Sequence, residues 1–142
     1  MSEMGYDAAT IGNHDFDGGL ENLATRMGEA GFPFLCTNYE LSGTPLHGAT
    51  LPYKVFQKGH IRIGVFGVCI EPKGLIDPLI GDLLNYSDPV AAAKKYATLL
   101  RKEERCDLVI CLSHLGYSYK ENKVSDEVLA RETSGIDLII GG

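Results

Sequence analysis

Short apolar runs alternate with helical patterns along nearly the whole chain, and this alternation limits the folds that the chain can adopt. The apolar runs at 62–70, 108–112 and 137–140 are each long enough for one buried strand. Between the first two, Asp88-Pro89 has the signature of a helix start, a capping residue followed by proline at the first helical position. The pattern predicts an α/β layered sandwich, with a largely parallel or mixed sheet flanked by helices.

The rest of the chain supplies further elements of such a sandwich. Apolar residues at helical spacing predict a helix over 20–30, and Ser125 can cap a short helix that ends near Glu132. Strands are expected over 6–11, 32–36 and 53–57. Glycine and proline punctuate 38–52 and 71–84, which we interpret as loops or turns.

Size and charge exclude several classes of protein. The 142 residues fit one domain, and a hydrophobic fraction of 44% is enough to bury a core. The formal net charge of −6 argues against nucleic acid as a partner, because the phosphate backbone repels an acidic surface. A small phosphate ester remains an allowed ligand, since bound metal ions can reverse the local field. No apolar run could span a bilayer, and residues 1–7 lack both segments of a secretory signal.

Four cysteines, at 36, 69, 106 and 111, mostly lie inside apolar runs. We expect them to be buried free thiols that act as small hydrophobic side chains. A zinc site is disfavoured, because Cys106 and Cys111 would point to opposite faces of one strand. Disulfides stay open, although no compact cysteine framework supports them.

Polar residues follow two of the predicted strands, at the edge where α/β sheets bind ligands. Asn13-His14-Asp15 comes after the first strand, and His114 comes after the run at 108–112. Asparagine offers a carbonyl oxygen to a metal ion, and histidine can bind a metal or transfer a proton. Each segment alone is equally compatible with an ordinary turn or a hydrogen-bonded strand end, but the two together favour a site.

Three other features have simpler interpretations. His47 and His60 are expected to be solvated or structural. Gly64 and Gly67 indicate close strand packing rather than a dinucleotide-binding loop, because the full glycine fingerprint is absent. Asp17 can support the loop after His14, although capping of the next helix is the interpretation that we favour.

The same residues carry a resemblance to a known family. The run from Met4 to Asp17, Met-Gly-Tyr-Asp leading into Gly-Asn-His-Asp-Phe-Asp, resembles a signature block of the calcineurin-like metallophosphoesterases, and is closest to their 5′-nucleotidase branch. Leu-Ser-His-Leu-Gly at 112–116 and Ile-Asp-Leu-Ile-Ile-Gly-Gly at 136–142 are similar to later blocks. Segments 34–38 and 61–67 stand in the expected order, so the resemblance covers nearly the whole chain.

The resemblance implies roles for four residues. Asn13 and His114 would be ligands of one of two divalent metal ions, with Mn, Zn, Fe and Co all left open. His14 would be the catalytic histidine that assists the leaving oxygen, and Asp15 would orient its ring. The implied activity is two-metal hydrolysis of a nucleotide or another small phosphate ester, by in-line attack at phosphorus.

Other blocks of the family do not occur in the sequence. No Asp-x-His or Gly-Asp block stands ahead of Asn13, the final Gly-His-x-His block would begin at Gly142, and the nucleotide-recognition domain is missing. We therefore interpret 1–142 as a partial metallophosphoesterase domain of an enzyme. Its metal centre is expected to be incomplete, and the isolated chain to be inactive.

A partial domain has consequences for association and location. The missing strands would leave a sheet edge open, which predicts self-association by edge pairing or domain swapping. Members of the branch are commonly exported, so the resemblance implies the periplasm or the cell surface. Two alternatives to a nucleotide-hydrolysing enzyme stay open: a cyclic-nucleotide phosphodiesterase or sulfur-ester hydrolase of the same fold, and a non-catalytic α/β module that binds at most one adventitious metal.

Overall fold

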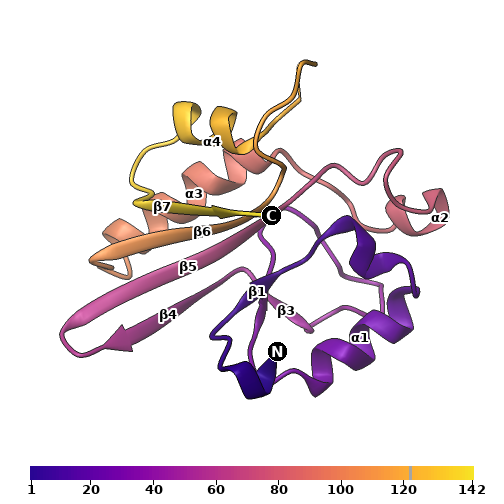
Figure 1. The fold of residues 1–142 in the computed structure, drawn as a ribbon, viewed down its shortest axis with the longest axis horizontal. Coiled ribbons are helices and arrows are strands. Elements are labelled where there is room, and N and C mark those ends of the chain that lie inside the picture. The colour runs from indigo at the N-terminus through magenta and orange to yellow at the C-terminus, as the bar shows by residue number, and fades with distance from the viewer. Residues whose placement is uncertain (122) are drawn as a thin grey trace.

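The computed structural model describes residues 1–121 and 123–142. Helices flank two small β-sheets in this part of the chain (Figure 1). The helices are α1 (Leu20–Glu29), α2 (Pro78–Gly81), α3 (Pro89–Lys102) and α4 (Asp126–Glu132), with two 3₁₀ helices, η1 (Ser2–Met4) and η2 (Asn13–Phe16). The strands are β1 (Ala9–Thr10), β2 (Phe34–Leu35), β3 (Thr50–Leu51), β4 (Tyr53–Lys58), β5 (Ile61–Cys69), β6 (Leu108–His114) and β7 (Leu138–Gly141).

The strands form one short parallel sheet and one longer mixed sheet. The order in the short sheet is β1-β2-β3, and all three strands are parallel. The longer sheet has the order β4-β5-β6-β7, in which β4 and β5 form an antiparallel hairpin and β5, β6 and β7 are parallel. This arrangement confirms the predicted α/β sandwich, in which parallel strands need crossover helices between them.

Capping residues set where the helices begin. The Asp88 side chain accepts a hydrogen bond from the backbone of Val90 at 2.9 Å, which starts α3 with Pro89 in its first turn. Ser125 caps α4 in the same way. Side-chain oxygens at these positions satisfy backbone N–H groups that have no partner inside the helix.

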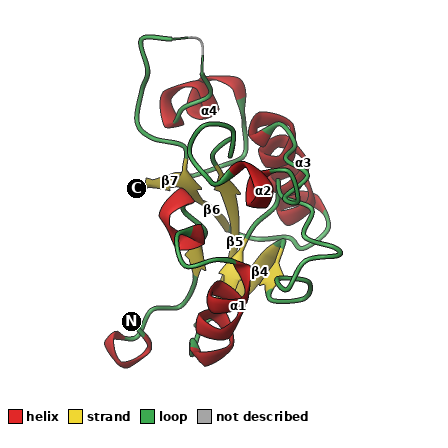
Figure 2. Cartoon of the chain, turned by 90° about the vertical axis from the view of Figure 1, so that its right-hand side faces the viewer, coloured by secondary structure: helices red, strands yellow, loops and turns green. Residues whose placement is uncertain are grey.

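Two hydrophobic cores hold the helices against the sheets. One core lies under α1, where Leu23 and Met27 pack with Ile11 and Phe16. The other lies between the longer sheet and the pair α3 and α4, and Phe66 is its largest buried side chain. Figures 1 and 2 show α3 and α4 on one face of the β4–β7 sheet, with α1 beside the shorter sheet. The carboxyl ends of β1 and β6 therefore meet where the two sheets adjoin.

Gly67 lets the two sheets approach closely. A Cβ atom at this position would lie 2.1 Å from the Leu35 carbonyl oxygen of β2 and 2.6 Å from Thr10 Oγ1 of β1. Gly64 is similarly crowded, by Leu100 and Cys106. Gly67 thus serves close strand packing, as the sequence predicted, whereas Gly64 makes room for side chains, including Leu100 of α3.

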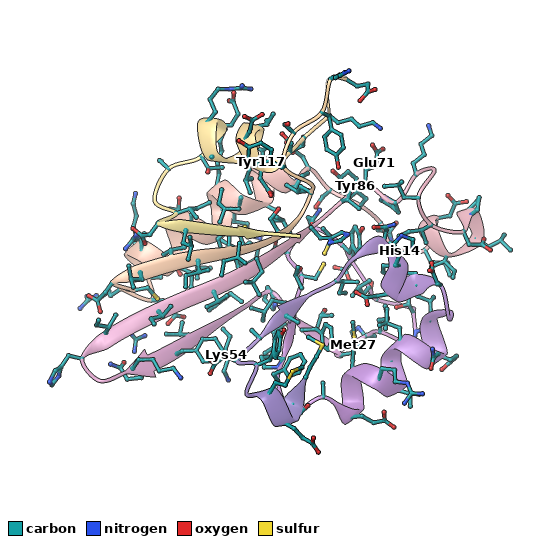
Figure 3. The ribbon with its side chains drawn as sticks, viewed as in Figure 1. His14, Met27, Lys54, Glu71, Tyr86 and Tyr117 are labelled. Atoms are coloured by element: carbon teal, nitrogen blue, oxygen red, sulfur yellow. The ribbon has the colours of Figure 1, made fainter. Side chains whose placement is uncertain are left out.

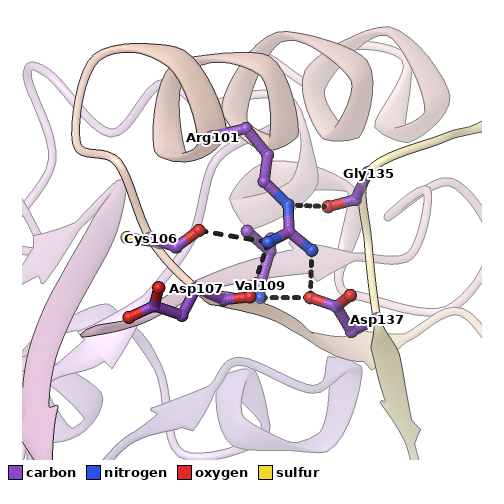
Figure 4. Close-up of polar contacts among 6 residues, drawn as sticks. All are labelled: Arg101, Cys106, Asp107, Val109, Gly135 and Asp137. Atoms are coloured by element: carbon purple, nitrogen blue, oxygen red, sulfur yellow. Dashed lines mark hydrogen bonds and ion pairs between the residues drawn. The ribbon is translucent and has the colours of Figure 1, made fainter. Parts of the chain in front are cut away.

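Arg101 ties the end of α3 to the amino ends of β6 and β7 (Figure 4). Its guanidinium donates to the backbone oxygens of Gly135 (3.1 Å), Cys106 (3.1 Å) and Asp107 (2.7 Å), and it forms an ion pair with Asp137. The Asp137 carboxylate also accepts from the Val109 backbone at 2.7 Å. This network fixes the sheet edge opposite to the polar residues at the carboxyl ends of the strands.

Several elements differ from the expectations in length or position. The first two strands pair over only two residues each, at 9–10 and 34–35, and β6 runs two residues further than expected, to His114. The stretches expected to be loops contain the short strand β3 and the single turn α2. Cys106 precedes β6 and lies in the same core as Cys111, so the expected opposite-face placement of these two cysteines was wrong. All four cysteines are free and buried.

Candidate functional site

Asn13 and His114 meet although 101 positions separate them in the sequence. His114 ends β6, and Asn13 opens η2, three positions after β1 ends. His114 Nε2 lies 3.0 Å from Asn13 Oδ1, and both residues are half-buried. The structure therefore brings together the two residues that the resemblance implied as ligands of one ion.

The Asn13–His114 pair fits a divalent metal ion in type and spacing. A carbonyl oxygen and an imidazole nitrogen suit Mn, Zn, Fe or Co. The 3.0 Å between Asn13 Oδ1 and His114 Nε2 is a hydrogen-bond distance, and it is also short enough for both atoms to bind one ion at about 2.1 Å. Across residues 1–121 and 123–142, however, no group of three or more His, Cys, Asp or Glu side chains could hold a metal ion. The described residues therefore bring together two candidate ligands, Asn13 and His114, and no cluster of three or more of those four residue types.

His14 lies on the exposed side of η2 and is held by Asp17. Its Nδ1 lies 3.0 Å from Asp17 Oδ2, and 85% of the His14 side chain is exposed. Because a carboxylate only accepts hydrogen bonds, Nδ1 carries the proton, and Nε2 is left free to face solvent or substrate.

Asp15 bonds elsewhere, so the expected contact from Asp15 to His14 is made by Asp17. The Asp15 carboxylate accepts from the Gly12 backbone at 2.7 Å, which closes the turn that carries Asn13 and His14. The physical reason is the 3₁₀ turn, which places residues three apart on the same side. Asp17 does not cap α1 either, since the capping position is Gly19, which makes no side-chain hydrogen bond.

Gly12 leaves the space that the His114 ring occupies. A Cβ atom on Gly12 would lie 2.9 Å from His114 Cε1 and 3.0 Å from Nε2. The φ angle of Gly12 is −100°, which other residues adopt freely. Glycine is therefore needed here for contact with the imidazole and not for its backbone freedom.

A cleft of about 590 Å³ opens beside Asn13 and His114. Its walls include Glu71, Lys73, Tyr86 and Tyr119. Figure 3 labels Glu71 and Tyr86 on segments of the chain next to the one that carries His14. Burial, together with the nearby carboxylates of Glu71 and Asp88, raises the pKa of Tyr86 to about 12.

Sequence reasoning found the centre of this site but not its walls. It named Asn13, His14, Asp15 and His114, and it expected His47 and His60 to be solvated or structural; both are exposed. The cleft residues come from the loop after β5 and from the segment after β6, and no local pattern marks them as partners. The spacing of three between His14 and Asp17 was the one signal that could have identified their contact.

Curated relatives cover the whole chain. A 5′-nucleotidase of Vibrio cholerae is 36% identical over 100% of the chain, and the chain spans 27% of that relative. The human 5′-nucleotidase is 32% identical, again over 100% of the chain and over 24% of its own length. The chain thus spans about a quarter of the curated relatives that it matches. No family model matches it.

Solved structures agree with the relatives and with the fold. A 5′-nucleotidase precursor from Thermus thermophilus has a TM-score of 0.84 and 32% identity, over 96% of this chain and 26% of that one. The calcineurin-like phosphoesterase YfkN from Bacillus subtilis has a TM-score of 0.75 and 28% identity, over 98% of this chain and 45% of that one. Together with the Asn13–His114 pair, these likenesses show that the chain belongs to the 5′-nucleotidase branch of the calcineurin-like metallophosphoesterases.

Proposed function

We propose that this chain is part of an enzyme that hydrolyses nucleotide phosphate esters with two divalent metal ions. The observation that supports this most is the convergence of Asn13 and His114 at 3.0 Å, next to the His14–Asp17 pair on the turn that follows β1. The names of the relatives give the substrate class, since they are 5′-nucleotidases. The chain spans about a quarter of those relatives, so activity and substrate are our proposal for the longer protein.

Each residue of the site has a separate part in this proposal. Asn13 and His114 would hold one ion through Oδ1 and Nε2. Bound divalent ions would supply Lewis acidity, which neutralises the charge that develops on the phosphoryl group. In its doubly protonated form His14 would donate from Nε2 to the leaving oxygen, while Nδ1 donates to Asp17, which keeps the ring in one orientation. We propose that Asp15 acts through the turn that it closes with Gly12.

The cleft suits an anionic ester with an organic leaving group. Lys73 and Lys123 lie on its walls and can attract a phosphate, although the chain as a whole is acidic. Tyr86 and Tyr119 offer aromatic surface to the rest of the substrate. The cleft therefore places positive charge and aromatic side chains beside the proposed metal ligands.

The remaining metal ligands would come from parts of the longer protein. Two ligands are too few for a dinuclear centre of ordinary affinity, because affinity depends on ligand number and geometry. We propose that the chain is a partial metallophosphoesterase domain, and that it is inactive or nearly so when isolated. The oxygen and imidazole ligands of Asn13 and His114 would suit Mn, Zn, Fe or Co.

The experiment is an assay of phosphate release from 5′-AMP with Mn²⁺ added. The longest product of the source locus, checked by intact mass, should hydrolyse 5′-AMP, and the 142-residue chain should not. A cyclic nucleotide and a thiosulfate ester are the comparison substrates, because the fold alone is shared with a sulfate thiohydrolase of Thermus thermophilus at 22% identity. Turnover by the isolated chain, or preference of the longer product for a comparison substrate, would overturn the proposal.

Association and location are further parts of the proposal. The strand β7 forms one edge of the longer sheet, and Leu138 and Ile140 on it are each 50% exposed. We propose that the isolated chain pairs with a second copy through this edge, which light scattering at high concentration would detect. The Thermus relative is described as a precursor, which supports an exported parent in the periplasm or at the cell surface. No helix in the described part of the chain is long and apolar enough to cross a membrane.

A further inference from the structure

Two buried cysteines touch at the junction of the two sheets. Cys36 follows β2 in the short sheet, and Cys69 ends β5 in the longer one. The Cys69 thiol donates to Cys36 Sγ, with the sulfur atoms 3.5 Å apart. A disulfide has an S–S distance of about 2.05 Å, so closure requires the sulfurs to approach by roughly 1.5 Å.

The backbone around both cysteines is already hydrogen-bonded in a way that permits this approach. The Thr37 backbone donates to the Gly67 oxygen at 2.9 Å, so the chain after β2 runs beside the end of β5. The fully buried Asn38 side chain donates to the Cys69 oxygen and accepts from its nitrogen, both at 2.8 Å. Gly67 adds a close approach of the two backbones, as its missing Cβ shows. The two backbone segments are therefore held side by side, and the sulfurs would approach by rotation of the two side chains.

We propose that Cys36 and Cys69 form a reversible disulfide on exposure to a peroxide, and that this bond staples the two sheets together. Cys36 is the sulfur that a small oxidant would meet first, since it is 6% exposed and Cys69 is fully buried. The hydrogen bond from Cys69 also lowers the pKa of the Cys36 thiol, which favours the reactive thiolate.

The chemical step balances with hydrogen peroxide as the oxidant. The Cys36 thiolate attacks one peroxide oxygen and breaks the O–O bond, which gives a sulfenic acid and one water once the released hydroxide takes up the thiol proton. The Cys69 sulfur then attacks the Cys36 sulfur, and its own proton leaves with the hydroxyl group as a second water. One S–S bond forms, two electrons pass from the thiols to the peroxide, and a dithiol reductant reverses the reaction.

A disulfide between Cys36 and Cys69 would also affect the site at Asn13 and His114. Asn13 follows β1 of the short sheet, and His114 ends β6 of the longer one, so each sheet supplies one of the proposed ligands. Cys69 is also the register partner of His114 across β5 and β6. A bond between Cys36 and Cys69 would fix the two sheets at the level of the Asn13–His114 pair. This consequence rests on the proposed function, whereas formation of the bond does not.

The other two cysteines provide a matched control for burial. Cys106 is 5% exposed and Cys111 is fully buried, which repeats the exposures of Cys36 and Cys69. In the described parts of the chain, the contact between two thiols is the one between Cys36 and Cys69. A difference between the two sets of cysteines would therefore report sulfur proximity and not access of the oxidant.

The test treats the native chain with hydrogen peroxide, unfolds it, counts the remaining thiols and maps non-reduced peptides by mass. Two of the four thiols should be lost, dithiothreitol should restore them, and the linked peptides should contain Cys36 and Cys69. The double variant C106S/C111S should lose both of its thiols, and C36S should lose none by cross-linking. Retention of all four thiols in the native chain, or linkage through Cys106 or Cys111, would overturn the proposal.

Urea unfolding tests the staple separately. The oxidised chain should unfold at a higher urea concentration than the reduced chain, because the bond closes a loop of about 34 residues and limits the unfolded state. C106S/C111S should show the same shift, which keeps the test valid if C36S does not fold. An unchanged or lower midpoint after oxidation would show that the bond does not hold the sheets together.

Discussion

His114 Nε2 lies 3.0 Å from Asn13 Oδ1, so the carboxyl ends of two strands in different sheets meet at one point. This contact joins the first and the last thirds of the chain. It places the two side chains that we propose as metal ligands beside a cleft of about 590 Å³ and beside the turn that carries His14. The account of function depends on this contact more than on any other.

Asp17, and not Asp15, should control the tautomer of His14. The Nδ1 proton of His14 is donated to Asp17 Oδ2 at 3.0 Å, whereas Asp15 accepts from the Gly12 backbone. Asp17→Asn should therefore shift the His14 ring from a single tautomer towards a mixture, as seen in ¹⁵N–¹H spectra of the imidazole. The matched variant Asp15→Asn should leave those signals in place. Equal effects of both variants would contradict the assignment.

Gly12→Ala should weaken divalent-metal binding by displacing His114. The added methyl would lie 2.9 Å from the imidazole, so the ring must move away from Asn13. Loss of ligand orientation typically weakens metal affinity by about tenfold or more. Calorimetric titration with Mn²⁺ would measure the change.

The control for that variant is Gly28→Ala. Gly28 lies on the exposed side of α1, and a Cβ there would meet nothing within 4 Å. This variant should bind Mn²⁺ as the native chain does, and it should raise the free energy of unfolding by about 0.5–1 kcal/mol through helix propensity. If Gly12→Ala bound Mn²⁺ as tightly as Gly28→Ala, the crowding argument would fail.

Arg101→Ala should lower the free energy of unfolding by about 2 kcal/mol. The substitution removes three hydrogen bonds to backbone oxygens and the ion pair with Asp137, and it leaves those acceptors without their partner. Urea unfolding monitored by circular dichroism would give the value. Arg26→Ala removes an exposed ion pair with Glu29 and should cost less than about 0.5 kcal/mol. Similar costs for the two variants would show that the network contributes little.

Tyr86 should make the chain less stable as the pH rises above 10. Its pKa is about 12 in the folded chain, while a tyrosine in an unfolded chain titrates near 10. Between these values the unfolded chain has lost the proton that the folded chain keeps, so the free energy of unfolding falls with increasing pH. Urea unfolding at several pH values should show a shallower fall for Tyr86→Phe. The exposed-site variant Tyr117→Phe should keep the slope of the native chain, and a native slope in Tyr86→Phe would contradict the prediction.

Sequence patterns were sufficient for the elements that propensity and burial decide locally. The Asp88-Pro89 start of α3, the Ser125 cap of α4 and the long apolar run of β5 all stand where they were expected. The short strand β3 was not predicted, because it pairs over only two residues and its conformation depends on β2. Its position at Thr50–Leu51 follows from tertiary contact, which no local pattern records.

In the candidate site, too, some features could be predicted from the sequence and others depend on tertiary contacts. Asn13 and His114 could be named because each stands at the end of a predicted strand, where α/β sheets bind ligands. That these two strands belong to different sheets was not predicted. The Cys36–Cys69 contact could not be found, since it depends on how closely Gly67 lets the two sheets approach. The fold class was thus predictable from periodicity, whereas contacts between the two sheets required their relative placement.

The most direct test of the central claim is a Mn²⁺ titration of the isolated chain, followed by electron paramagnetic resonance. The account predicts one weak site that is lost in both Asn13→Ala and His114→Ala. His47→Ala should retain it, because His47 is an exposed histidine that does not line the cleft beside the proposed ligands. Binding that survives in Asn13→Ala and His114→Ala, or that disappears in His47→Ala, would contradict the claim that Asn13 and His114 share one metal ion.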